Sequence, residues 1–203
     1  MKIICVGRNY ADHAKELKNE VPEDPVIFMK PDTSLLLNNV DFYMPDFSND
    51  VHHELEIVYR VSREGKFIQP RFAMSYLDGV GIGIDFTARD LQSKLKEKSL
   101  PWTLAKGFNN AAPVSNFLPM ETFPDHRKID FHLHLNGIEK QKGNSSNMIF
   151  SIENLIAFIT RFITIKKGDM IFTGTPAGVG PVKPGDQLEG WLGKEKLIDF
   201  AVK

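Results

Sequence analysis

The chain has 203 residues, of which 42% are hydrophobic and 25% charged, a composition typical of one globular domain with a buried core. Lysine and arginine together number 25 against 26 for aspartate and glutamate. The resulting net charge of -1 gives no overall field that would attract nucleic acid or an anionic membrane. The single cysteine, Cys5, excludes an internal disulfide and a cysteine-rich zinc site. We therefore expect one domain over residues 1–203, in which any ligand is held by local groups.

The N-terminal residues carry no targeting pattern. Met1 is followed almost directly by the apolar segment Ile3–Val6, and acidic residues begin at Asp12. This order is typical neither of a signal peptide nor of an acid-poor mitochondrial presequence. No apolar run approaches the ~18 residues of a membrane span. Because the lone Cys5 also fits a reducing compartment, we expect a cytoplasmic protein.

The first elements follow from apolar runs and capping residues. Ile3–Val6 is predicted to form a strand, and Asn9 to cap a helix that runs to Leu17. Charges and a proline in Asn19–Asp24 then predict a mobile connection.

Three strands are predicted in the next part of the chain. Val26–Met29 and Leu35–Leu37 are short apolar runs bounded by turn residues. From Val51 to Val61 the residues alternate, which predicts one continuous strand with Glu54 and Glu56 on the same face. Two carboxylates therefore project side by side.

The segment Asp78–Phe86 alternates glycine with β-branched residues. One face of the predicted strand carries only glycines up to Asp85, which we expect to leave room for a ligand. A helix is predicted from Thr87, so Asp85 lies just before its N-terminus.

The second half of the chain adds a hairpin and a helix. Alternation in Ile129–Leu135 leads into Asn136-Gly137, a strong signal for a two-residue hairpin turn. Ser151–Ile165 has the apolar spacing of a helix, and short β runs with glycine and proline follow. The predicted fold class is α+β and strand-rich.

Three carboxylates are candidate metal ligands. Glu54 and Glu56 repel each other on one strand face unless a cation lies between them, and Asp85 ends the glycine face. An all-oxygen ligand set suits Mg²⁺, with Mn²⁺ also possible. The alternative is a pair of solvated carboxylates on an edge strand.

A histidine and a lysine are candidate catalytic groups. His13 and Glu16 lie three residues apart on the first helix, so the carboxylate can orient the imidazole. Lys106 is a lone cation in an apolar segment, where a substrate carboxylate could neutralise it. An exposed helix pair and a lysine that extends to solvent are the alternatives.

Three weaker signals are discounted. The glycines before Asp85 lack the spacing of a dinucleotide-binding fingerprint. His132 and His134 could bind a metal from one strand, but the polar face of a hairpin favours two solvated side chains. The segment Gly174–Gly180 could cradle an anion, yet it lacks the ending of a phosphate-binding loop.

Five motifs in sequence give a resemblance over nearly the whole chain. They are Gly7-Arg8-Asn9-Tyr10 with His13 and Glu16, His53-Glu54-Leu55-Glu56, Asp85-Phe86-Thr87-Ala88-Arg89-Asp90, Trp102-Thr103-Leu104-Ala105-Lys106, and Thr173-Gly174-Thr175-Pro176 with Gly178-Val179-Gly180. In this combination the chain resembles the fumarylacetoacetate hydrolase family. It is most similar to the small single-domain branch, which contains acylpyruvate hydrolases, oxaloacetate decarboxylases or tautomerases, and isomerases of 2-hydroxyhepta-2,4-diene-1,7-dioate.

The resemblance implies a mixed β-roll or sandwich with a few flanking helices, and a homodimer. It also implies site residues. They are Glu54, Glu56 and Asp85 for Mg²⁺ or Mn²⁺, His13 and Glu16 as a dyad on a segment that closes over substrate, Lys106 as a catalytic lysine, and Thr175, Arg8 and Gln92 for substrate binding.

The expected activity follows from this set of groups. A metal and Lys106 can stabilise a pyruvate enolate while His13, oriented by Glu16, activates water. We expect hydrolysis of the carbon-carbon bond of an acylpyruvate-like 2-oxo acid. Oxaloacetate decarboxylation or tautomerisation and dienedioate isomerisation share the same enolate and stay open as alternatives. A non-enzymatic module that binds an anion at Gly174–Gly180 is the remaining alternative.

Overall fold

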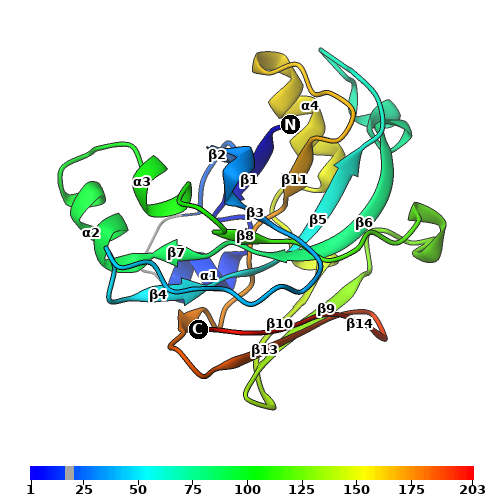
Figure 1. Ribbon diagram of the computed structural model, residues 1–203. Coiled ribbons are helices and arrows are strands. Elements are labelled where there is room, and N and C mark those ends of the chain that lie inside the picture. The colour runs from blue at the N-terminus through cyan, green and yellow to red at the C-terminus, as the bar shows by residue number, and fades with distance from the viewer. Residues whose placement is uncertain (17–20) are drawn as a thin grey trace.

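The computed structural model describes residues 1–16 and 21–203 as an α+β fold that is rich in strands (Figure 1). The predicted fold class is confirmed. Residues 17–20 lie outside the described residues, and with them the predicted helix end at Leu17 and the first part of the predicted connection Asn19–Asp24.

The central sheet has five strands. Their order is β2 (Val26–Lys30), β1 (Ile3–Gly7), β11 (Met170–Phe172), β5 (Leu55–Val61) and β6 (Leu77–Ile84). β1 is parallel to β11, and the other pairs are antiparallel. β1 lies between two strands and is buried from Ile3 to Val6, which is why this short segment is apolar on both faces.

A second sheet contains β10 (Ile138–Asn144), β9 (Asp130–Leu135), β13 (Gln187–Leu192) and β14 (Glu195–Ala201), in that order. It lies at the bottom of Figure 1. The predicted hairpin turn is confirmed, since Asn136 and Gly137 have φ of 54° and 76° between β9 and β10. The inner face packs on the central sheet, because a Cβ at Gly190 would lie 2.9 Å from Ile82.

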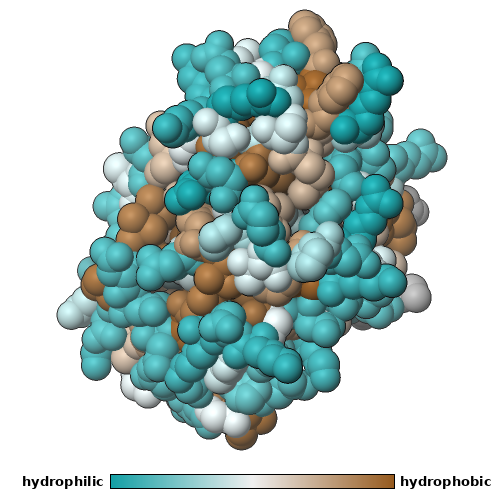
Figure 2. Space-filling view, turned by 90° about the vertical axis from the view of Figure 1, so that its right-hand side faces the viewer, coloured by the Kyte–Doolittle hydropathy of each residue, from teal (hydrophilic) through white to brown (hydrophobic). Residues whose placement is uncertain are grey.

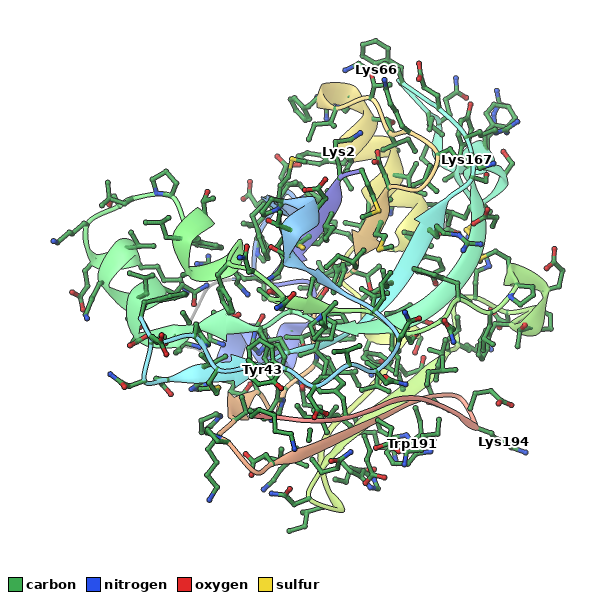
Figure 3. The ribbon with its side chains drawn as sticks, viewed as in Figure 1. Lys2, Tyr43, Lys66, Lys167, Trp191 and Lys194 are labelled. Atoms are coloured by element: carbon green, nitrogen blue, oxygen red, sulfur yellow. The ribbon has the colours of Figure 1, made fainter. Side chains whose placement is uncertain are left out.

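The outer face of this second sheet carries an aromatic group. The rings of His132 and His134 lie 4.8 Å and 4.7 Å from that of Trp191, and Figure 3 shows Trp191 on the side away from the rest of the molecule. The two histidines are thus partly exposed and far from the predicted site residues.

Two small sheets lie between these layers. One contains β12 (Gly180–Pro181), β4 (Val51–His53) and β7 (Thr87–Ala88), and the other pairs β3 (Leu35–Leu36) with β8 (Ala112–Pro113). The prediction of one continuous strand from Val51 to Val61 was wrong. The strand breaks at Glu54 because the side chain of Gln141 accepts the hydrogen bond of the Leu55 N–H at 2.9 Å.

Four α-helices surround the sheets within the described residues: α1 (Ala11–Glu16), α2 (Arg89–Glu97), α3 (Thr103–Lys106) and α4 (Ile152–Phe162). Short 3₁₀ turns cover Asp32–Ser34, Pro70–Tyr76, Met120–Thr122 and Ser145–Asn147. Ser151 caps α4 as its spacing predicts, although the helix ends before Ile163.

Two predicted helix starts need correction. α2 begins at Arg89 and not at Thr87, because residues Thr87–Ala88 pair with β4 as a strand. Asn9 does not cap α1. Its buried amide instead donates to the carbonyl groups of Phe150 and Thr173 and accepts from the Phe150 N–H.

On the face shown in Figure 2, hydrophilic residues surround hydrophobic ones that gather in the middle and at the top of the view. Among the described residues, no helix combines the length and the apolar character needed to cross a membrane.

Candidate active site

Three carboxylates meet at the junction of β5 and β6. Glu54 directly precedes β5, Glu56 lies in it, and Asp85 directly follows β6. The antiparallel register pairs Leu55 with Ile84 and Glu56 with Gly83, which brings the end of β6 against the start of β5. Glu54, Glu56 and Asp85 are 5%, 2% and 0% exposed, and one oxygen from each lies within 4.8 Å of the others. The structure therefore brings together the predicted metal ligands in one buried cluster.

Lys106 neutralises part of this charge. It is the last residue of α3, and its Nζ lies 2.9 Å from Glu54, 2.6 Å from Asp85 and 2.6 Å from the Thr87 hydroxyl. Burial alone would lower the pKa of Lys106, but Asp85 and Glu54 raise it above its ordinary value. The alternative of a lysine that extends to solvent is therefore wrong, and the ammonium group stays charged inside the cluster.

A second buried lysine was not predicted. Lys30 ends β2, and its Nζ lies 2.7 Å from Asp85 and donates to the carbonyl groups of Phe86, Lys106 and Ala111. Its side chain is fully buried. A charge at the end of the apolar run Val26–Met29 is the only sign of it in the sequence.

Arg89 supplies the third positive charge. From the first turn of α2 it contacts Glu54 and donates at 2.7 Å to the buried amide oxygen of Gln92. Burial alone would raise the pKa of Glu54, but Lys106 and Arg89 outweigh this effect and lower it. Burial and the negative charge of Asp85 raise the pKa of Glu56, and they outweigh the hydrogen bond from the Gly174 N–H, at 2.7 Å, and the positive charge of Lys106.

The cluster fits a hard divalent cation. All three ligand atoms are carboxylate oxygens, the ligand type that Mg²⁺ and Mn²⁺ prefer, and they lie within 4.8 Å of one another. Asp85 Oδ1 already lies 2.7 Å from the Lys30 ammonium group, whereas Glu56 makes no ion pair among the described residues. The raised pKa of the Glu56 carboxyl group therefore favours an added positive charge in the cluster.

The predicted dyad lies beside this cluster. His13 is 5% exposed and its Nδ1 lies 3.1 Å from Glu16, on α1. Glu16 also accepts from the Gly178 N–H at 3.1 Å, so one carboxylate joins the histidine to the glycine-rich loop. In the neutral tautomer that donates from Nδ1, the Nε2 of His13 keeps its lone pair and can act as a base.

The site residues line one small cavity. Arg8, His13, Arg89, Gln92, Lys96, Lys106 and Thr175 surround it together with the three carboxylates, Phe28 and Trp102. Arg8 has a left-handed backbone, with φ of 60°, and its side chain reaches this wall. The Thr175 hydroxyl donates to Leu55 and accepts from Gln141, at 2.8 Å and 2.7 Å. Eight of the nine predicted site residues thus line this cavity, and the ninth, Glu16, contacts His13. The structure adds Arg89 and Lys96 to the lining, while Lys30 and Gln141 contact Asp85 and Thr175 from outside it.

The bare glycine face does not accommodate a ligand. A Cβ at Gly81 would lie 2.8 Å from the Ser115 hydroxyl, and one at Gly83 would lie 2.7 Å from the Phe172 ring. The glycines are needed because the chain's own segments pack directly against β6. The expectation of ligand space along this face was therefore wrong.

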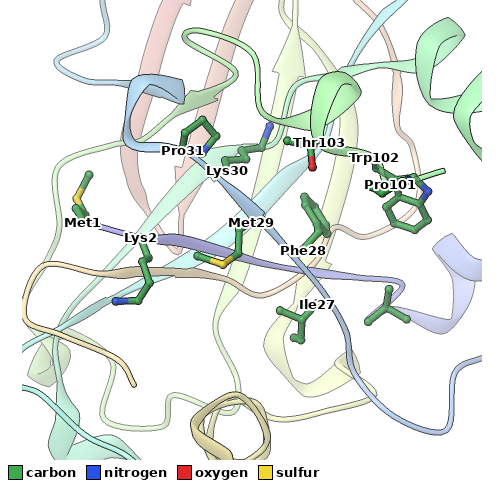
Figure 4. A pocket seen from close by; sticks show the side chains of 11 residues that line it. Met1, Lys2, Ile27, Phe28, Met29, Lys30, Pro31, Pro101, Trp102 and Thr103 are labelled. Atoms are coloured by element: carbon green, nitrogen blue, oxygen red, sulfur yellow. The ribbon is translucent and has the colours of Figure 1, made fainter. Parts of the chain in front are cut away.

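A larger groove of about 620 Å³ lies on the other side of two aromatic residues (Figure 4). Phe28 and Trp102 line both the groove and the site cavity, and their rings meet edge to face at 6.2 Å. They therefore form a wall between the site cavity and the groove over β2.

Comparison with known proteins places this geometry in a family. The model of the fumarylacetoacetate (FAA) hydrolase C-terminal domain matches residues 2–199. The chain belongs to the fumarylacetoacetate hydrolase family. The resemblance in the five sequence motifs is confirmed.

Relatives of this family cover almost the whole chain. The mouse protein named oxaloacetate tautomerase FAHD1, mitochondrial, is 43% identical over 99% of this chain and 91% of its own length. The Dictyostelium discoideum protein named oxaloacetate decarboxylase, mitochondrial, is 44% identical over 99% and 93%. The structure of fumarylpyruvate hydrolase from Pseudomonas aeruginosa with Mn²⁺ and pyruvate is 30% identical, with a TM-score of 0.94 over 100% of this chain and 89% of that one. The fold of this family member is therefore the fumarylacetoacetate hydrolase C-terminal fold.

Proposed function

We propose that this chain is a divalent-metal-dependent enzyme that interconverts the keto and enol forms of oxaloacetate or a closely similar 2-oxo acid. The observation that carries the proposal is the convergence of a carboxylate cluster, a buried ammonium group and a histidine base on one cavity. The names of the mouse and Dictyostelium relatives support oxaloacetate over the acylpyruvate that the sequence alone favours.

The charges of the site support an anionic substrate. Glu54, Glu56 and Asp85 are matched by three cations in contact with them, Lys30, Lys106 and Arg89. A divalent ion on the ionised carboxylates therefore leaves two positive charges, which a dianion such as oxaloacetate balances. Mg²⁺ and Mn²⁺ both fit three oxygen ligands, and either would supply Lewis-acid stabilisation to an oxygen that gains negative charge.

The residues of the chain account for the proton transfer. His13, held by Glu16, removes a proton from the carbon next to the 2-oxo group through Nε2. The electron pair of that C–H bond forms a double bond to the 2-oxo carbon, the π electrons of the carbonyl group move onto its oxygen, and the ammonium group of Lys106 stabilises the negative charge there. Return of the proton to this oxygen gives the enol, so the reaction consumes no water.

Three other outcomes use the same groups. Loss of CO₂ from oxaloacetate leaves the enolate of pyruvate and needs no base, and the name of the Dictyostelium relative supports this reaction. Hydrolysis of an acylpyruvate requires His13 to activate water, and the similar fumarylpyruvate hydrolase structure favours this second candidate. Isomerisation of a dienedioate is a further proton transfer of the same kind.

The test is a substrate panel on metal-depleted protein. Oxaloacetate, acetylpyruvate, fumarylpyruvate and 2-hydroxyhepta-2,4-diene-1,7-dioate are assayed with chelator, with Mg²⁺ and with Mn²⁺. We expect rapid loss of the enol absorbance of oxaloacetate only with metal. Pyruvate release measured in parallel separates tautomerisation from decarboxylation and hydrolysis. Full activity after chelation, or no activity on oxaloacetate with metal, would contradict the proposal.

Two variants separate the roles of base and cation. Loss of a general base costs about 10²- to 10⁴-fold in rate, so His13→Ala should abolish tautomerisation and acylpyruvate cleavage while reducing decarboxylation less. Lys106→Met should reduce all three reactions, because each passes through the enolate. The control is His132→Ala, which removes a histidine on the outer face of the second sheet.

A further inference from the structure

One side of α2 faces the site cavity. Arg89, Gln92 and Lys96 are spaced i, i+3 and i+7, which places them on one face of the helix, and all three line the cavity. Arg89, at the first turn, contacts Glu54. Lys96 lies about 10 Å farther along the helix axis, given a rise of about 1.5 Å per residue. The helix therefore presents positive charge from the carboxylate cluster to the far end of the cavity.

Lys96 differs from Lys106, Lys30 and Arg89, which all contact the carboxylates. In the part of the chain that the structure describes, Lys96 is half-buried and its ammonium group makes no ion pair. It lies over the face of the Trp102 ring, whose centroid is 5.2 Å away. A partly desolvated ammonium group beside other cations is unfavourable unless an anion joins it.

The charges around Lys96 also favour a bound anion. Burial, Arg89, Arg8 and Lys106 lower the pKa of Lys96 to about 8. Arg8 lines the same cavity and, within residues 1–16 and 21–203, also makes no ion pair. Two cations that repel each other across one cavity form a site for a carboxylate, which each can bind in place of the missing partner.

We infer that Lys96, together with Arg8, binds the distal carboxylate of a 2-oxo dicarboxylic acid, and that Lys96 determines the preference for such substrates over monocarboxylic ones. This inference rests on the proposed function, in which the carboxylate cluster and Lys106 take the 2-oxo end of the substrate. The separation along α2 leaves room for a short carbon chain between the two ends. Trp102 limits the cavity beside Lys96 and keeps its ammonium group on this side of the wall.

The test compares two unreactive ligands that differ only at the far end. Malate and 2-hydroxybutyrate share a 1-carboxylate and a 2-hydroxyl group, but the distal carboxylate of malate is a methyl group in 2-hydroxybutyrate. Their affinities for the Mg²⁺-loaded protein are measured by calorimetry for the natural chain, Lys96→Met, Lys96→Arg and the control Lys94→Met. Lys94 lies on the same helix with its side chain exposed.

We expect malate to bind the natural chain more tightly than 2-hydroxybutyrate does. Lys96→Met should weaken the binding of malate by about tenfold or more, as expected for loss of a hydrogen bond between charged groups. The affinity for 2-hydroxybutyrate should stay unchanged. Lys96→Arg should keep most of the preference and Lys94→Met all of it. With oxaloacetate, Lys96→Met should raise KM by a similar factor with a smaller change in kcat.

Equal affinity of the natural chain for both ligands would overturn the inference, and so would equal weakening of both in Lys96→Met. Circular dichroism and Tm of each variant show whether it is folded. Because the binding measurement needs no turnover, absence of oxaloacetate turnover would contradict the proposed function while leaving the ligand preference measurable.

Discussion

Asn9 provides the sharpest test of how the structure supports the site. Its amide is fully buried and joins three parts of the chain: it donates to the Phe150 carbonyl at 3.0 Å and the Thr173 carbonyl at 2.8 Å, and accepts from the Phe150 N–H at 2.8 Å. Asn9→Ala removes all three bonds and leaves three buried backbone groups without this partner. At about 1 kcal/mol each, the free energy of unfolding should fall by about 3 kcal/mol.

The assay is urea unfolding followed by two independent probes, with Tm measured by calorimetry. For a chain of this length, about 3 kcal/mol corresponds to a Tm lower by about 6 to 12 °C. Asn9→Asp should cost at least as much, because a carboxylate would face two carbonyl oxygens. Asn147→Ala, at an exposed asparagine, is the matched control and should change stability by less than about 0.5 kcal/mol.

The activity of Asn9→Ala should also fall at temperatures where the variant is folded, since Asn9 lies between Arg8 and the helix that carries His13. A loss of stability no larger than that of the Asn147→Ala control would refute the reasoning. It would mean that water or a backbone shift satisfies the three groups equally well.

Three further predictions concern separate parts of the molecule. Mg²⁺ at a hundredfold excess over Kd should raise the free energy of unfolding of the natural chain by about 2.7 kcal/mol, and its Tm with it. Glu56→Gln should abolish this stabilisation, whereas Glu139→Gln at an exposed position should preserve it. For Glu153, hydrogen bonds from His126 and Arg127 outweigh burial and lower the pKa to about 2. Its stabilising contribution is therefore present above the ordinary pKa and is lost as pH falls toward 2. Glu153→Gln should reduce the free energy of unfolding by about 1 to 2 kcal/mol at pH 7 and remove this pH dependence in urea titrations. Gly178→Ala should cost about 2 kcal/mol or more in the same titrations, because φ is +96° and the new Cβ would meet the Lys140 carbonyl oxygen. An unchanged Tm in that variant would show that the loop relaxes freely.

The features that local sequence patterns predicted correctly are those that depend on residues adjacent in the sequence. The hairpin at Asn136 follows from a dipeptide that permits two positive φ values, and the cap at Ser151 from its place before an apolar run. The pair Glu54 and Glu56 follows from the period of a strand. Each of these features depends on a few consecutive residues, which is why the sequence reveals them.

Features that depend on distant contacts were missed or mispredicted. The strand breaks before Leu55, where the Leu55 N–H donates to the side chain of Gln141, 86 residues away. Nothing in the sequence of the strand itself predicts this contact. The glycine face of β6 is bare in the sequence, but only the fold shows that Ser115 and Phe172 pack against it. The ammonium group of Lys30 is held beside Asp85 by three carbonyl groups from other segments, and the residues around Lys30 in the sequence predict only that a strand ends there.

The glycine-rich loop explains how the metal cluster and the dyad are held in one geometry. Gly174 donates its N–H to Glu56, and Gly178 donates its N–H to Glu16. Both glycines have positive φ, which lets these two N–H groups point toward carboxylates from different elements. The loop is thus an anion-binding segment, as its composition suggests, but the anions are side chains of the same chain. Because one loop contacts both Glu56, a proposed metal ligand, and Glu16, the proposed partner of His13, a change in its backbone should disturb metal affinity and proton transfer together.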